Sequence, residues 1–321
     1  MKRRIFFRAD ASVRIGYGHF VRTLALAEMM SDSFECTFFT ANPSVSQLAD
    51  LEKVCPYVIL SEETKYNDFL SHLSGDEIVV LDNYFFTSEY QLRIKEKGCK
   101  LICFGTNDRH YYSDVLINYA ESNPRIFDAE LYTRFMLGID WVILRREFRN
   151  LHPLPKTPSH RIAICYGGTD QFCLTEKTVE VIQNLPQSYS IDVIASDRFG
   201  ANRFESLQQR GVSCHINASA AEMVGMFEHC DYLISSASTI THEGIACGLP
   251  VLCGYYVDNQ QRMYDYFVAE RLVIGLGDML SSSFPTLLAD NLNHIDERRS
   301  TIRSFVYGDI KNRYKSLFES L

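Results

Sequence analysis

The chain of 321 residues lacks the features of two large classes of protein. No apolar run approaches the roughly 20 residues that span a bilayer, and the basic start at residues 1–4 leads into an apolar strand rather than a signal-peptide core. Basic residues are not in excess, because the formal net charge is −8 and the pI is about 5.6. A negative balance argues against a nucleic-acid partner. We therefore expect a cytoplasmic protein with no stable membrane insertion.

Three chemical motifs are also missing. The ten cysteines have no zinc-ligand spacing. The turn Gly16-Tyr17-Gly18-His19 lacks the third glycine of a dinucleotide-binding fingerprint. No DxD-type metal motif occurs, because Asp108, Asp170 and Asp258 fall in separate loops. We expect no metal and no cofactor, and we expect the cysteines to be reduced core residues, as at Cys36, Cys103, Cys165 and Cys253.

What the chain does have is a repeating pattern of short apolar runs and amphipathic helices, which is typical of βα units in a parallel sheet. A chain that is 46% apolar can bury a large core, and its length predicts two domains. The polar stretch 145–160 carries Pro153, Pro155 and Pro158 and is the candidate linker. We predict an α/β protein with Rossmann-like domains at 1–155 and 156–321, the second ending in a helix within 296–321. The predicted strands are 4–7, 36–40, 57–60, 77–81, 100–104, 114–118, 161–165, 191–195, 212–216, 232–234 and 250–255, with a further apolar run at 141–144.

Two such domains predict a cleft between the carboxyl ends of two sheets, where ligands of α/β proteins bind. The first turn places Gly16 and Gly18 before a helix whose N-terminus favours anions, with His19 at its mouth. We interpret His19 as a base beside an anion site. The alternative is a helix-terminal histidine with a satisfied ring.

Other candidates follow strands in the same way. Asp82-Asn83-Tyr84 follows the strand 77–81, and Tyr84 either meets a sugar or packs in a turn. In the second domain, each candidate has two possible roles: it binds a ligand, or it only forms a turn or caps a helix. Those candidates are Gly167, Gly168 and Thr169 in a glycine turn, Ser236, Ser238, Thr239 and Glu243 around a helix start suited to a diphosphate and a ribose, and Asn259 at the next helix.

Several segments resemble one family in chain order: 8–12, 15–19, 22–27, 167–170, 235–243 and 259–260. They are similar to the UDP-sugar hydrolases of pseudaminic acid biosynthesis, which belong with the two-domain GT-B glycosyltransferases related to the MurG transferase. The chain departs from the family pattern at Asn83, where the family often has histidine. It departs again at 104–108, where the family has an aspartate pair.

The resemblance implies an inverting hydrolysis of a UDP-linked 2,4-diacetamido-2,4,6-trideoxy-β-L-altrose to the free sugar and UDP. Apart from the resemblance, we expect the reaction to be metal-independent and the protein to be a monomer. The resemblance implies that His19 is the general base, Tyr84 the tyrosine at the substrate and Asn259 the asparagine near it. We add Asp10, Gly16, Gly18 and Arg22 as substrate-binding residues, with the glycine turn and serine-rich helix start binding UDP. The alternatives are a GT-B glycosyltransferase, in which His19 deprotonates an acceptor hydroxyl, and a nucleotide-sugar binding module without chemistry.

Overall fold

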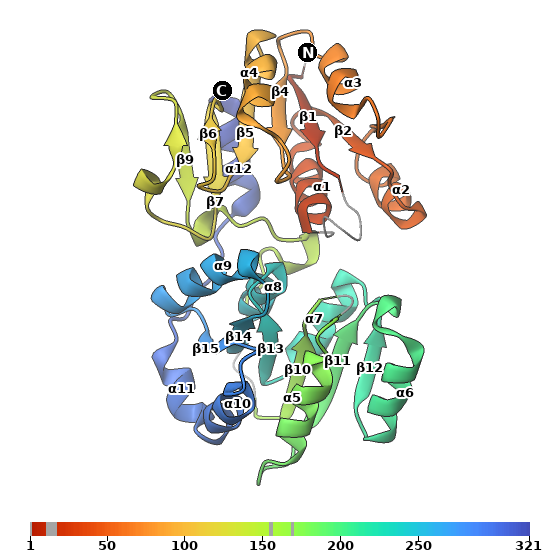
Figure 1. The fold of residues 1–321 in the computed structure, drawn as a ribbon, viewed down its shortest axis with the longest axis vertical. Coiled ribbons are helices and arrows are strands. Elements are labelled where there is room, and N and C mark those ends of the chain that lie inside the picture. The colour runs from red at the N-terminus through yellow and green to blue at the C-terminus, as the bar shows by residue number, and fades with distance from the viewer. Residues whose placement is uncertain (1, 11–17, 154–156, 168–169) are drawn as a thin grey trace. The chain divides into compact units, whose positions relative to one another are not determined.

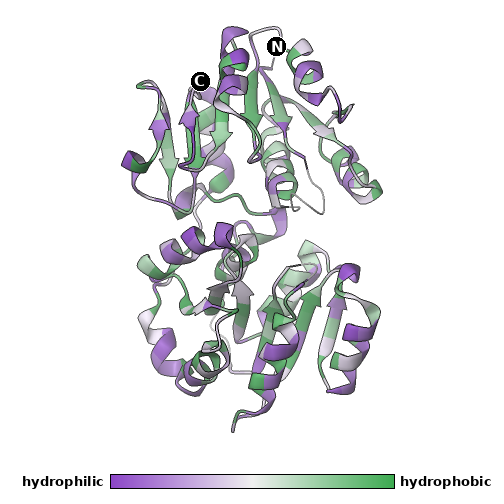
Figure 2. Ribbon diagram, in the orientation of Figure 1, coloured by the Kyte–Doolittle hydropathy of each residue, from purple (hydrophilic) through white to green (hydrophobic). Residues whose placement is uncertain are grey.

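The computed structural model describes residues 2–10, 18–153, 157–167 and 170–321 and contains two compact units (Figure 1). The first unit comprises Met1–Arg145 and Gly308–Leu321, and the second comprises Arg146–Tyr307. In both units the strands are largely apolar and the exposed helix faces are hydrophilic (Figure 2). Within the described ranges, no helix has the length and apolar character to cross a membrane.

The first unit is built on a seven-stranded parallel sheet with the order β3-β2-β1-β4-β5-β7-β9. All four residues of β4 are buried, which explains the uninterrupted apolar sequence of this central strand. Leu81 at the end of β4 pairs with Arg8 at the end of β1, so the chain leaves both strands at neighbouring points of one edge. The strands are β1 (Arg4–Arg8), β2 (Glu35–Ala41), β3 (Tyr57–Leu60), β4 (Ile78–Leu81), β5 (Lys100–Phe104), β7 (Val115–Asn118) and β9 (Arg134–Leu137).

Helices connect these strands and bury one face against the sheet. In α2, Ser44 accepts a hydrogen bond from the backbone N–H of Gln47, whose side chain bonds back to the N–H of Ser44 and so completes a capping box. A separate two-stranded ribbon pairs β6 (His110–Tyr111) with β8 (Asp128–Ala129). The helices are α1 (Gly18–Met30), α2 (Val45–Glu52), α3 (Lys65–Ser71), α4 (Ser88–Glu96) and α12 (Ile310–Glu319).

The second unit repeats this architecture with a six-stranded parallel sheet of order β12-β11-β10-β13-β14-β15. Its core gathers aliphatic side chains such as Ile164, Val193 and Leu252. The strands are β10 (Arg161–Cys165), β11 (Ser190–Ala195), β12 (Ser213–Ile216), β13 (Tyr232–Ser236), β14 (Val251–Tyr255) and β15 (Ile274–Asp278), and the helices are α5 (Leu174–Gln183), α6 (Ala201–Gln209), α7 (Ala220–His229), α8 (Thr239–Ala246), α9 (Asp258–Ala269), α10 (Phe284–Asn293) and α11 (Ile295–Thr301).

The structure corrects the assignment of the terminal helix to the second domain. The predicted helix within 296–321 is two helices, and the second of them, α12, belongs to the first unit. Its Phe318 ring lies 5.9 Å from that of Phe34, and the Tyr314 hydroxyl donates to the Trp141 carbonyl. The reason is apolar burial, because Tyr314, Leu317 and Phe318 are each 5% exposed or less.

Two edge strands, β9 and β15, were not predicted, and the run 141–144 forms no strand. Trp141 is the last residue of a 3₁₀ turn. The three residues that follow it, Val142, Ile143 and Leu144, are buried but have no regular secondary structure. Burial in the core without a strand partner explains the strand-like apolar pattern of this run. The expectation for the cysteines is confirmed at Cys36, Cys103, Cys165 and Cys253, which are free and buried, and it is wrong at Cys173, which is free and exposed.

Candidate functional site

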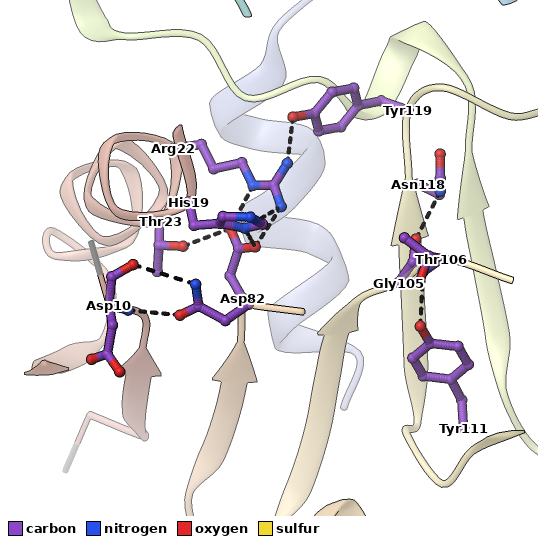
Figure 3. A network of polar contacts seen from close by, with 11 residues as sticks. Asp10, His19, Arg22, Thr23, Asp82, Gly105, Thr106, Tyr111, Asn118 and Tyr119 are labelled. Atoms are coloured by element: carbon purple, nitrogen blue, oxygen red, sulfur yellow. Dashed lines mark hydrogen bonds and ion pairs between the residues drawn. The ribbon is translucent and has the colours of Figure 1, made fainter. Parts of the chain in front are cut away.

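Polar side chains gather at the carboxyl edge of the first sheet, where β1, β4, β5 and β7 end (Figure 3). Asp10 follows β1, and Asp82 and Asn83 follow β4. All three are at most 7% exposed. A buried polar group needs hydrogen-bond partners, so the identity of those partners shows what each residue does.

His19 and Asp82 form the central pair of this edge. His19 is the second residue of α1, and its Nδ1 lies 2.7 Å from Asp82 Oδ1. Their side chains are 7% and 0% exposed. An ionised carboxylate can only accept, so Asp82 favours the tautomer with the proton on Nδ1. The other ring nitrogen, Nε2, then carries a lone pair and can accept a proton.

Asp82 is held by four donated hydrogen bonds. Besides His19, they come from Nε and Nη2 of Arg22 and from the hydroxyl of Thr23 at 2.8 Å from Oδ2. Because His19, Arg22 and Thr23 all lie in the first turns of α1, one helix presents donor groups from three residues to a carboxylate on the neighbouring strand end. Asp82 is therefore fixed in position and orientation.

The same contacts set the ionisation of Asp82. Burial raises the pKa of this carboxyl, but Arg22 and then His19 oppose burial and hold its pKa well below the ordinary value of 3.8. The pKa of Arg22 is correspondingly raised well above its ordinary value, since Asp82 and Tyr119 outweigh burial of the guanidinium. Asp82 thus stays an anion, which is the form that accepts from His19.

Aromatic rings enclose this charged group. The Tyr84 ring meets the His19 ring edge to face, with centroids 4.5 Å apart and an interplanar angle of 89°. The Arg22 guanidinium lies 5.0 Å from the Phe104 ring centroid and donates to the Tyr119 hydroxyl at 2.7 Å. Tyr84 is 49% exposed, so it combines a contact with His19 and access to solvent.

The loop that follows β5 is fixed by hydrogen bonds from its neighbours (Figure 3). Asn118 donates from its amide to the Gly105 carbonyl at 2.7 Å, and the Thr106 N–H donates to the Tyr111 hydroxyl at the same distance. A Cβ on Gly105 would come within 2.2 Å of Leu116 Cδ1 and 2.8 Å of Tyr111 Cζ. A side chain at position 105 would therefore displace Leu116 and Tyr111.

Asp10 plays a different part from the one expected. Its carboxylate accepts from the Arg8 guanidinium and the Ala41 N–H and lies 3.4 Å from Lys65 Nζ. Burial raises the pKa of Asp10, but the hydrogen bonds and the charge of Arg8 lower this pKa by more than burial raises it. The pKa of Asp10 therefore lies below its ordinary value. At 2% exposure, Asp10 ties β1 to β2 rather than offering a carboxylate to a ligand.

Asn83 fixes the same point of the chain from the other side. Its Oδ1 accepts from the Asp10 N–H at 2.7 Å, and its Nδ2 donates to the Asp10 carbonyl at 3.3 Å. The Asn83 amide thus replaces the ladder bonds that β1 loses where it ends. This two-point bond positions the chain as it leaves β1 towards α1.

In the second unit, β13 and β14 end side by side, and their loops lead into α8 and α9. Ser236 is 2% exposed, and its hydroxyl accepts from Gln260 Nε2 at 3.3 Å. Gln260 Oε1 in turn accepts from the Tyr256 N–H at 3.1 Å. Ser238 precedes α8 but donates to the Ser236 carbonyl, so no side chain caps this helix. The N-terminus of α9 likewise has no side-chain cap.

The remaining candidates divide into placed and undescribed residues. Gly167 has a φ of +90° beside Tyr256, as a turn glycine requires. Asn259 is exposed in the first turn of α9, Thr239 begins α8, and Glu243 is 2% exposed one turn further along. Gly16, Gly168 and Thr169 lie outside the residues that the structure describes. Among the described residues, there is no cluster of three or more His, Cys, Asp or Glu side chains that could hold a metal ion.

Sequence reasoning did not single out Thr23 or Tyr119, and it named Asp82 and Gln260 only within the candidate segments 82–84 and 259–260, without predicting the contacts that they make. Asp82 had a usable signal, because an aspartate directly after a fully apolar strand marks the carboxyl edge of a parallel sheet. Thr23 also had one, because it lies four residues after His19 on the same helix face. Tyr119 and Gln260 depend on contacts between segments distant in sequence.

Comparison with solved structures defines the class of fold. MurG of Acinetobacter baumannii superposes with a TM-score of 0.68 at 10% identity, covering 99% of this chain and 100% of that chain. Anabaena HepE, solved in complex with UDP-glucose, gives a TM-score of 0.60 at 9% identity over 99% of this chain and 100% of its own. The chain has the GT-B fold, which confirms the predicted α/β class with two Rossmann-like domains.

Among proteins of known sequence, the chain is similar to the UDP-2,4-diacetamido-2,4,6-trideoxy-β-L-altropyranose hydrolase of Campylobacter jejuni, with 25% identity over 80% of this chain and 93% of that protein. It is 24% identical to the spore coat polysaccharide biosynthesis protein SpsG of Bacillus subtilis, over 85% of this chain and 84% of that protein. It is 25% identical to the uncharacterized protein MJ1062 of Methanocaldococcus jannaschii over 83% of this chain, and it spans only 58% of that longer protein. No family model matches the chain.

Proposed function

We propose that this protein hydrolyses a UDP-linked 2,4-diacetamido-2,4,6-trideoxy sugar to the free sugar and UDP, with inversion at the anomeric carbon. The observation that carries the proposal is the bond between His19 Nδ1 and the buried Asp82 carboxylate, which leaves Nε2 able to accept a proton. Similarity to the C. jejuni hydrolase supports the reaction and the class of sugar. The sugar of that relative's name, the β-L-altropyranose derivative, is the proposed substrate.

In the proposed reaction, His19 Nε2 takes a proton from water while the water oxygen attacks C1 of the sugar. The bond between C1 and the oxygen of the β-phosphate breaks, and both of its electrons leave with UDP. A base positioned in this way contributes on the order of 10²–10⁴ in rate. The imidazolium that forms is stabilised by Asp82, as the aspartate of a catalytic triad stabilises its histidine.

The neighbours of His19 are proposed to bind the sugar. Tyr84 touches the His19 ring and is half exposed, so it is suited to contact both the base and a sugar face. A Cβ added at Gly18 would meet no atom of the described residues within 4 Å, so a ligand can approach this point of the backbone without a clash with them. Arg22 already gives its donors to Asp82 and Tyr119, and we assign it to positioning of Asp82.

The second unit is proposed to bind UDP. The uncapped N-termini of α8 and α9 offer first-turn N–H groups and a positive dipole end, both of which suit a diphosphate. Ser236, Ser238 and Thr239 surround the start of α8, with Gly167 at the neighbouring strand end. Glu243 as the ribose contact and Asn259 as a substrate contact stay predictions.

The same geometry supports a second candidate. A base at His19 Nε2 would equally deprotonate the hydroxyl of an acceptor, which would make the protein a glycosyltransferase. The two candidates differ in one requirement, since a hydrolase releases UDP with water alone and a transferase needs the acceptor. A binding module would release no UDP under either condition.

The test is to incubate the purified protein with a panel of UDP-linked diacetamido sugars, without acceptor, and to follow UDP release and the anomeric product by NMR. We expect UDP and an inverted free sugar from the diacetamido-trideoxy substrate. His19→Asn should abolish release while UDP binding by calorimetry is retained. The matched control is His72→Asn, because His72 is an exposed histidine of the same unit. Release that depends on an added sugar or lipid would instead establish a transferase.

A further inference from the structure

A pocket of about 520 Å³ lies in the second unit, on the side of the sheet next to α7. This volume falls within the roughly 300–1,000 Å³ of small-molecule sites. None of the residues proposed to bind UDP belongs to it. The pocket is lined by Arg161, Asp192, His215, Ile216, Ala218, Glu222, Gly225, Met226 and His229.

The floor of the pocket is a row of polar side chains across three adjacent strands, β10, β11 and β12, whose order can be followed in Figure 1. Asp192 is 3% exposed and lies between two partners. Arg161 Nη1 donates to one carboxylate oxygen at 3.0 Å, and His215 Nε2 lies 2.7 Å from the other. Side chains of alternate strand residues share a face, so this register places all three on one face of the sheet.

The partners of Asp192 are themselves accessible. The side chains of Arg161 and His215 are 42% and 33% exposed, so each contributes only part of its hydrogen-bonding capacity to the buried carboxylate. The guanidinium has five N–H groups and the imidazole a second nitrogen. The floor therefore presents polar groups whose orientation is fixed by a buried anchor.

One wall is the face of α7 that carries Glu222, Gly225, Met226 and His229, at helical spacings of three and four residues. Gly225 lies in the interior of this helix, where glycine costs about 1 kcal/mol relative to alanine. In the part of the chain that the structure describes, no atom lies within 4 Å of the position of a Cβ there. Packing thus does not require the glycine, and its absent side chain leaves open space over the sheet.

The charges of the pocket compensate one another. Arg161 and His215 face Asp192, and the bonds from Ser219 followed by the charge of His215 lower the pKa of Glu222. An anionic ligand would meet two carboxylates, and a cationic ligand would meet the guanidinium and the imidazole. Ile216, Ala218, Gly225 and Met226 supply an apolar strip beside these polar groups.

We propose that this pocket is a second ligand site that binds a neutral, polyhydroxylated ring of the monosaccharide class. Hydroxyl groups both donate and accept, which matches the mixed guanidinium, imidazole and carboxylate floor. The C–H face of a sugar ring matches the apolar strip of Ile216 and Met226. The site is independent of the reaction proposed for His19.

The test uses the Met226 methyl group as a local reporter in the full-length protein. Methionine methyls are labelled with ¹³C, the Met226 signal is assigned with Met226→Leu, and methyl glucoside or N-acetylglucosamine is added in the millimolar range. We expect the Met226 signal to shift with both neutral sugars and to stay in place with inorganic phosphate or ethylammonium. Gly225→Leu, which fills the open space, should abolish the shift.

Ala221→Leu is the control, because it adds the same side chain at an exposed position of α7. It should leave the sugar-dependent shift unchanged, and circular dichroism should show that both variants are folded. His215→Ala should weaken the response at least several-fold. The proposal is overturned if Met226 does not respond to neutral sugars, if phosphate or ethylammonium moves it as much, or if the response survives in Gly225→Leu.

Discussion

At the scale of single residues, Asp82 determines what His19 can do. Asp82→Asn keeps the shape of the side chain but removes the charge, so its amide can donate to Nδ1 and favour the tautomer that protonates Nε2. We expect kcat to fall by about 10²–10⁴, the range of a positioned general base. Steady-state release of UDP measures this effect, and the KM should change little. An unchanged kcat would remove Asp82 from the account.

The same variant makes a prediction about pH. A carboxyl whose pKa is lowered by folding stabilises the native state above its unfolded pKa and loses that contribution as the pH falls. The free energy of unfolding should therefore be higher for the parent protein than for Asp82→Asn near neutral pH. The difference should narrow below about pH 4, as the carboxyl becomes protonated in the unfolded chain. Urea unfolding at several pH values measures it, and a difference that grew on acidification would contradict the ion pairing.

Asn83 gives a second prediction at this scale. Asn83→Leu removes both hydrogen bonds to the Asp10 backbone, so the buried N–H and carbonyl of Asp10 each lose the bond to this side chain. Each orphaned group costs about 1–3 kcal/mol, so the free energy of unfolding should fall measurably in urea denaturation. Asn202→Leu makes the same change at an exposed position of α6 and should have little effect. Equal losses in the two variants would mean that the Asn83 bonds contribute nothing.

At the scale of elements, α12 returns to the first unit and packs on α1. Leu317→Ala opens a cavity at a buried position of α12 and should destabilise this unit by about 2–5 kcal/mol. Hydrogen exchange followed by mass spectrometry should show faster exchange in α1 and α12 and unchanged exchange in β10–β14 of the second unit. Ser316→Ala changes an exposed neighbour on the same helix and should leave both units unaffected. Faster exchange confined to the second unit would contradict the placement of α12.

The helix N-termini of the second unit lead to a prediction about metals. Backbone N–H groups and the positive ends of α8 and α9 can stabilise the charge of a departing diphosphate without a divalent cation. UDP release should therefore proceed at the same rate after treatment with EDTA as before it. A loss of activity with EDTA, restored by Mg²⁺ or Mn²⁺, would show that these helix ends do not suffice.

At the scale of the whole molecule, patterns repeated along the sequence predicted the alternating strands and helices of both units. The apolar runs of β1, β4 and β10 are buried on both faces of a sheet, which makes them easy to recognise. The edge strand β9 was missed because none of its four residues is buried. The edge strand β15 was missed because glycines alternate with its two buried residues, Ile274 and Leu276, and interrupt the apolar run. The placement of α12 depends on contacts with chain some 170 to 280 residues earlier, which no local pattern records.

The candidate site shows the same division. The turn before α1 and the serine-rich start of α8 are local signals, and they led directly to His19, Ser236 and Ser238. The partners of these residues come from other elements, as with Asp82 after β4 beside His19 and Gln260 in α9 beside Ser236. Asp10 was expected to bind substrate, and it lies in the segment 8–12 that carries the family resemblance. Its carboxylate instead accepts hydrogen bonds from the Arg8 side chain and the Ala41 N–H. Ala41 comes near Asp10 only when the chain folds, so the sequence does not show this contact.

The central claim is that His19, held by Asp82, activates water to attack the anomeric carbon of a UDP-linked sugar. The most direct measurement is to run the reaction in ¹⁸O-labelled water without acceptor and to analyse the released UDP by mass spectrometry. The account predicts that UDP forms and carries no ¹⁸O, because water attacks carbon and the bond between C1 and oxygen breaks. Release of ¹⁸O-labelled UDP would show attack at phosphorus and would contradict the account, as would the absence of release until an acceptor is added.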